Sequence, residues 1–248
     1  MRRFKRMILT AGVTAVGGLV LAGPAMAQNN PVVIDFEGSK KKGTLSIRLG
    51  PQAADPPFKT NNTIVRTSSG ITIDSGFVPD CPPAALEGLD PNAALAACGP
   101  AAGKKKNALI ATGDATAVIG SGAQAVTLAA DAMAFAGPGA DVIVYARVEA
   151  LGVTQIIPCK LGTAPAPYKD SFDCAVPPLA GGAGALKSFN LLFDRSEVVK
   201  KKKKNGKKKK KTFSVVKGTC PAGGAYVSEV SFTYDDGPPE TNQYSDPC

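Results

Sequence analysis

Apolar and polar positions alternate with a period of two in short runs along most of the chain. In residues 44–49, for example, Leu45, Ile47 and Leu49 fall on one face of an extended segment, and polar residues alternate with them. Glycine and proline separate these runs, which favours antiparallel strands joined by turns over alternating strands and helices. The pattern therefore predicts an all-β fold, an antiparallel β-sandwich with long hairpins.

Further strands are expected wherever the same alternation recurs. They cover residues 32–36, 63–67, 71–77, 108–112, 115–119, 141–148, 153–158, 187–193 and 225–234. Residues 125–135 fit either a strand or a helix, and both assignments stay open. In residues 225–234 the apolar positions shift by one, which predicts a bulge near Glu229.

Ten lysines near the C-terminus form two blocks of five on either side of Asn205-Gly206. Asn-Gly between two extended runs is the strongest short-range signal for a two-residue hairpin turn, because both turn residues take positive φ. We therefore expect a hairpin with a cationic tip, and shorter basic tips at residues 40–42 and 104–106. The candidate binding residues are Lys200, Lys201, Lys202, Lys203, Lys204, Lys207, Lys208, Lys209, Lys210 and Lys211.

Two interpretations of these lysines stay open. Lysine commonly protects the edge of a sheet against aggregation, and runs of like charge are most often solvated segments. Alternatively, the ten lysines bind a polyanion such as an anionic cell-wall polymer or an acidic polysaccharide, by diffuse charge and without specific nucleic-acid recognition.

Residues 1–27 have the features of a secretory signal peptide. Four basic side chains precede an apolar run at residues 7–21, and Ala25-Met26-Ala27 is a small-x-small cleavage site. The run is shorter than the roughly 20 residues that cross a bilayer. We expect a secreted, extracellular protein, with one domain at residues 28–248, no transmembrane segment in the mature chain, and a possible internal boundary near residues 175–186.

The basic character of the chain is local. The whole sequence has 29 Lys and Arg against 20 Asp and Glu, a net charge of +9. Removing the four basic residues of segment 1–27 leaves 25 against 20, or +5, and removing the ten lysines as well leaves 15 against 20, or −5. A uniformly basic binding face is therefore not expected.

An even number of cysteines in an exported chain indicates disulfides. Six cysteines allow 15 pairings, and we predict the sequential one because each pair then closes a local loop: Cys81–Cys98, Cys159–Cys174 and Cys220–Cys248. The first loop should hold one short helix, capped by Asp90 and ending at Ala97. No CxxC pair and no histidine are present, so no metal site is predicted.

The residues for common catalytic chemistry are missing. Without histidine, the chain alone cannot perform Ser-His or Cys-His catalysis. Gly120-Ser121-Gly122 fits a dinucleotide pattern loosely, but lacks the third glycine and is better explained as a hairpin turn. The adjacent Asp235 and Asp236 are expected in a turn. We therefore predict no enzymatic activity and no cofactor, while a structural or protein-interaction module and, more weakly, a carbohydrate-active protein stay as alternatives.

The cysteine-containing segments resemble those of a group of secreted proteins. The C-terminal end combines Cys220-Pro221, the aromatic segment 231–234, an Asp-Gly turn and the final Cys248. This arrangement resembles the C-terminal end of uncharacterised secreted proteins from high-GC actinobacteria, and residues 81–117 are similar to their middle part. The resemblance implies an all-β exported domain and no particular activity.

Overall fold

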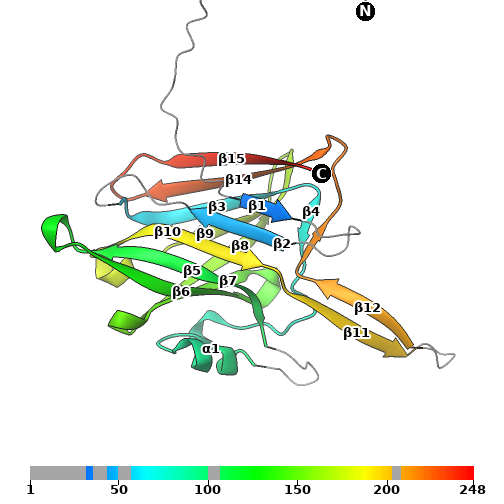
Figure 1. Ribbon diagram of the computed structural model, residues 1–248, viewed down its shortest axis with the longest axis horizontal. Coiled ribbons are helices and arrows are strands. Elements are labelled where there is room, and N and C mark those ends of the chain that lie inside the picture. Colours follow the sequence, from blue (N-terminus) through cyan, green and yellow to red (C-terminus); the bar gives the residue numbers. More distant parts are fainter. Residues whose placement is uncertain (1–31, 36–43, 50–56, 100–106, 203–207) are drawn as a thin grey trace, which may run out of the picture.

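The computed structural model describes residues 32–35, 44–49, 57–99, 107–202 and 208–248. These residues form fifteen strands, one α-helix and five short 3-10 turns. The all-β prediction is therefore confirmed, and the ambiguous segment 125–135 is a strand (Figure 1).

Eleven antiparallel strands make up the main sheet. Their order is β1 (Val32–Asp35), β2 (Thr44–Leu49), β10 (Gly184–Phe193), β5 (Leu109–Ile119), β6 (Val126–Ala136), β7 (Val142–Val148), β8 (Val153–Thr163), β9 (Tyr168–Ala175), β3 (Thr60–Ser68), β14 (Ala225–Tyr234) and β15 (Glu240–Pro247). Two small antiparallel pairs accompany it, β4 (Ile71–Ile73) with β13 (Val216–Gly218), and β11 (Ser196–Lys202) with β12 (Lys208–Ser214).

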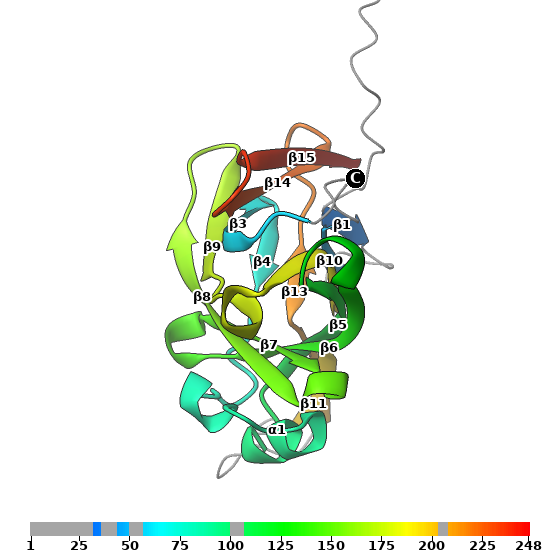
Figure 2. The ribbon, with the colours of Figure 1, turned by 90° about the vertical axis from the view of Figure 1, so that its left-hand side faces the viewer.

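The main sheet curls until its two ends meet. Strand β1, at one end of the strand order, lies against β14 and β15 at the other end. The two halves of the sheet consequently face each other across the core, as the layers of a sandwich do (Figures 1 and 2). The two layers are thus parts of one continuous sheet.

The last five residues of β6 and the first four of β7 are buried on both faces of the sheet. Ala134 and Val144 point into the main core, while Phe135 and Tyr145 point outward into a second apolar cluster. A strand that is buried on both faces loses the apolar–polar alternation and has the composition of a buried helix. This double burial explains why the sequence of β6 is compatible with either element.

The outer cluster is covered by a helical excursion that the Cys81–Cys98 disulfide closes. It contains the 3-10 turn η1 (Pro83–Ala85) and the helix α1 (Pro91–Ala97), whose N-cap Asp90 accepts a hydrogen bond from the backbone of Ala93 at 2.9 Å. The predicted helix and its cap are confirmed. The other two predicted disulfides, Cys159–Cys174 and Cys220–Cys248, are also formed.

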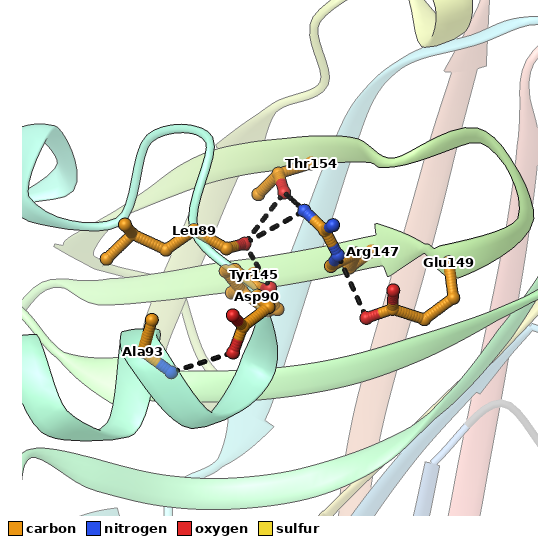
Figure 3. Close-up of polar contacts among 7 residues, drawn as sticks. All are labelled: Leu89, Asp90, Ala93, Tyr145, Arg147, Glu149 and Thr154. Atoms are coloured by element: carbon orange, nitrogen blue, oxygen red, sulfur yellow. Dashed lines mark hydrogen bonds and ion pairs between the residues drawn. The ribbon is translucent and has the colours of Figure 1, made fainter.

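One backbone carbonyl fastens the excursion to the sheet (Figure 3). The oxygen of Leu89 accepts hydrogen bonds from Tyr145 Oη at 2.8 Å, Thr154 Oγ1 at 3.0 Å and Arg147 Nη1 at 3.1 Å. Arg147 is held in turn by Glu149, whose carboxylate lies 2.9 Å from its Nε atom. We call these groups the Leu89 latch.

The predicted bulge near Glu229 is wrong. The pairing of β14 with β15 continues regularly through residue 229, the pairing with β3 is regular from residue 229 onward, and the irregularity lies between Thr233 and Tyr234. Ser228 therefore shares the core face with Val230 and Phe232, and it is fully buried. Because Ser228 is polar but occupies a core position, the apolar positions in the sequence of β14 look shifted by one residue.

No helix in the described part of the chain is long and apolar enough to cross a membrane.

The Leu89 latch generates a stability prediction for Tyr145→Phe. We expect the free energy of unfolding to fall by only about 1 kcal/mol, because the Leu89 carbonyl keeps Arg147 and Thr154 as donors and the aromatic ring stays packed. Urea unfolding measures the change, and Tyr244→Phe on the edge strand β15 is the matched control. A loss similar to the roughly 3–5 kcal/mol of a ring deletion would contradict this account of the latch.

Candidate functional site

The candidate lysines lie on a hairpin that extends away from the main sheet. Strands β11 and β12 form a separate two-stranded sheet that projects at the lower right of Figure 1. Its register places Lys200 opposite Lys210, Lys201 opposite Lys209 and Lys202 opposite Lys208. The backbone therefore sets lysine positions directly against one another on the two strands.

This register differs by one residue from the one that an unbulged two-residue turn at Asn205-Gly206 would give. A two-residue Asn205-Gly206 turn that continues without a bulge pairs Lys202 with Lys209, whereas the structure pairs Lys202 with Lys208. A one-residue shift exchanges the faces of a whole strand. The tip itself, with Lys203, Lys204 and Lys207, lies outside the described residues, as do the expected basic tips at 40–42 and 104–106.

The base of the hairpin is firmly held by the core. Val215 and Val216, at its C-terminal root, are fully buried. At the opposite root, the Arg195 guanidinium donates to the carbonyl oxygen of Asn107 at 3.0 Å and to its side-chain oxygen at 2.9 Å. The backbone N–H of Val215 donates to the Arg195 carbonyl at 2.9 Å and closes the base. The hairpin is thus a projection on a fixed support.

The acidic pair near the C-terminus is occupied by structural contacts. Asp235 accepts a hydrogen bond from Asn61 Nδ2 at 2.7 Å, and Asp236 accepts one from the backbone N–H of Lys59 at 2.8 Å. Both carboxylates thereby join the β14–β15 turn to the start of β3, as the turn interpretation predicts.

Gly120 and Gly122 lie in the hairpin that connects β5 with β6. Their φ angles are +85° and +58°. Glycine reaches these values without strain, and β6 pairs antiparallel with β5 after the turn. The segment is therefore a hairpin connection, and it lacks the parallel strand–helix–strand context of a dinucleotide site.

A buried carboxylate that the sequence analysis did not select lies on β14. Glu229 is 8% exposed and forms an ion pair with Arg66 of β3. Its other oxygen accepts hydrogen bonds from Gln243 Nε2 at 2.9 Å and Tyr168 Oη at 3.0 Å. The signal in the sequence was the isolation of Glu229, which is the only charged residue in its strand.

The surroundings of Glu229 favour its ionised form. Burial by itself raises the pKa of the carboxyl, but the hydrogen bonds from Gln243, Tyr168 and Arg66 together outweigh burial and bring the pKa below its ordinary value. Burial, followed by the hydrogen bond to Glu229, raises the pKa of the Tyr168 hydroxyl. Both carboxylate oxygens of Glu229 are engaged within the fold, so the cluster ties four strands together, β3, β9, β14 and β15.

The curled sheet also contains an internal cavity of about 90 Å³. Its walls come from both halves of the sheet and are apolar except for the side chains of Thr63 and Gln155. Sequence reasoning missed this cavity, because its lining residues are ordinary core positions on many separate strands.

Among the described residues, no group of three or more His, Cys, Asp or Glu side chains could hold a metal ion. No family model, curated protein or solved structure matches the chain. The function is therefore argued from its own residues.

The Glu229 cluster predicts a specific acid sensitivity. Folding lowers the pKa of the Glu229 carboxyl, and such a carboxyl stabilises the folded state fully at pH values above the ordinary pKa of the unfolded chain. This stabilisation is lost as the pH falls through the lowered pKa of the folded state. We expect Glu229→Gln to be less stable than the wild type at pH 7 by about 1–3 kcal/mol. We also expect this difference to shrink as the pH is lowered from roughly 5 to 3.

Urea unfolding at a series of pH values measures both effects. Glu87→Gln, which alters an exposed carboxylate outside the cluster, is the matched control and should follow the wild-type profile. A constant difference between wild type and Glu229→Gln across the whole series would show that Glu229 contributes by packing alone.

Proposed function

We propose that this chain is an exported, non-enzymatic protein that binds an anionic cell-surface polymer through its lysine hairpin. The observation that carries the proposal is the register of β11 and β12, which opposes lysine to lysine at three successive positions on a projecting hairpin. Like charges directly opposite each other destabilise a strand pair. A bound polyanion removes that repulsion.

The number and placement of the lysines favour binding over edge protection. One or two lysines suffice to discourage edge-to-edge pairing, whereas this hairpin has ten within twelve residues. Without them and without segment 1–27, the chain carries a net charge of −5. The charge therefore draws a polyanion to the hairpin and away from the rest of the molecule.

The location follows from the disulfides together with the N-terminal segment. Three disulfides are typical of proteins that fold in an oxidising compartment. Residues 1–27 supply the export signal in this proposal, and the mature protein is released to the cell exterior.

Co-sedimentation of the mature protein with cell envelopes tests the proposal. One variant replaces all ten hairpin lysines with glutamine, and the matched control replaces them with arginine, which keeps both length and charge. We expect wild type and the arginine variant to sediment and the glutamine variant to stay in solution. Binding of the first two should fall at least about tenfold between 50 and 200 mM salt, because counterions compete for the polymer.

Two results would contradict the proposal. Equal sedimentation of the glutamine variant would assign the lysines to edge protection, and aggregation of that variant would support the same conclusion. Retention of the wild type in about 0.5 M salt, where screening is strong, would indicate a binding surface other than the hairpin.

A further inference from the structure

Three neighbouring connections at one end of the curled sheet are almost free of charge, whereas the charged β14–β15 turn lies elsewhere on that end. The β5–β6, β7–β8 and β9–β10 connections gather there and face the viewer in Figure 2. Pairing of Ile119 with both Val126 and Gly184 brings the first and third connections together. Across residues 119–126, 148–153 and 175–184, Glu149 is the only charged residue.

Two of these connections, β5–β6 and β7–β8, also expose large apolar side chains. The exposed fractions are 53% for Val126, 49% for Leu151 and 37% for Val153. Only one other large apolar side chain in the described residues, Leu161, is comparably exposed. An exposed apolar rim without charges is unfavourable in water unless it has something apolar to contact.

The internal cavity extends to this end. The side chains of Ala146, Gln155 and Leu179 line it there, and all three are half-buried. Deeper in the sheet the lining residues are core positions such as Ala115 and Val144. The cavity therefore continues from the apolar rim into the apolar interior.

A short segment between β9 and β10 covers the cavity. The 3-10 turn η5 (Leu179–Gly182) contributes Leu179 to the lining, and Ala180, Gly181 and Gly182 have φ angles of +47°, +66° and +92°. Gln155 Nε2 reaches the neighbouring carbonyl of Pro177 at a long 3.3 Å. Two backbone hydrogen bonds also hold the segment, from the Gly120 N–H to the Ala183 carbonyl at 3.0 Å and from the Val176 N–H to the Asn61 carbonyl at 2.9 Å, so it forms one wall of the cavity.

We propose that this cavity binds the terminal part of the straight alkyl chain of an amphiphile, which enters at these three connections. An apolar cavity with so few polar partners does not hold ordered water. Its volume of about 90 Å³ is less than the roughly 150 Å³ of a cavity that binds benzene, which favours a narrow chain over a ring. The polar head would stay at the rim, beside the amide of Gln155.

Titration of the mature protein with n-alkanols of increasing length tests this proposal. Methyl NMR spectra of the alanine, valine, leucine and isoleucine residues report the site. We expect saturable binding with shifts at Ala115 and Val144. The affinity should rise about fourfold for each added methylene until the cavity is full, and then level off.

Ala115→Leu is the decisive variant, because its added side chain fills the cavity from β5. We expect it to bind at least about tenfold more weakly than the wild type. Ala129→Leu on β6 adds the same group at an exposed position and should bind as the wild type does.

Two outcomes would overturn the proposal. One is non-saturating binding of the wild type with shifts confined to Val126, Leu151 and Val153, which would mean that alkanols touch only the rim. The other is unchanged affinity in Ala115→Leu. If Ala115→Leu does not fold, the chain-length series of the wild type decides by itself, since rim contact alone predicts no plateau.

Discussion

The need to cover one apolar sheet face governs this structure. A sheet with an apolar face must pack it against another layer, and here the layer is the other half of the same sheet. The closure depends on β1 reaching β14 and β15. Once the sheet has curled, its connections lie at two ends. The lysine hairpin projects from one end, and the apolar cavity reaches the other.

When the inner face of the sheet is covered, the outer faces of β6 and β7 still carry apolar side chains that need a covering layer. Their outward residues Phe135 and Tyr145 are apolar and completely buried. The disulfide-closed excursion covers them, and the Leu89 latch fixes its position through hydrogen bonds from three side chains of β7 and β8. A loop with one short helix can serve as a rigid layer because a covalent bond and a shared carbonyl limit its movement.

The two proposed binding sites lie at different ends of the molecule and use opposite physical forces. The β11–β12 hairpin projects at the right of Figure 1, whereas the β5–β6 connection lies at its left. Long-range attraction between lysines and a polyanion weakens with salt, while burial of an alkyl chain is short-ranged and nearly independent of charge. A molecule held to a surface by the hairpin would therefore keep the end with the cavity accessible.

The sequence by itself determined the elements whose causes are local. The period-two alternation specified strands, Asp90 and Pro91 specified the start of α1, and the closeness of cysteines in the chain favoured the observed disulfide pairing. The ten lysines were equally visible, since charge needs no partner to be recognised.

Only the tertiary structure decided the rest. The register of β11–β12, the inward position of Ser228, the partners of Glu229 and the cavity all depend on which distant strands become neighbours, because a sheet brings together residues far apart in the chain and no local pattern encodes that proximity.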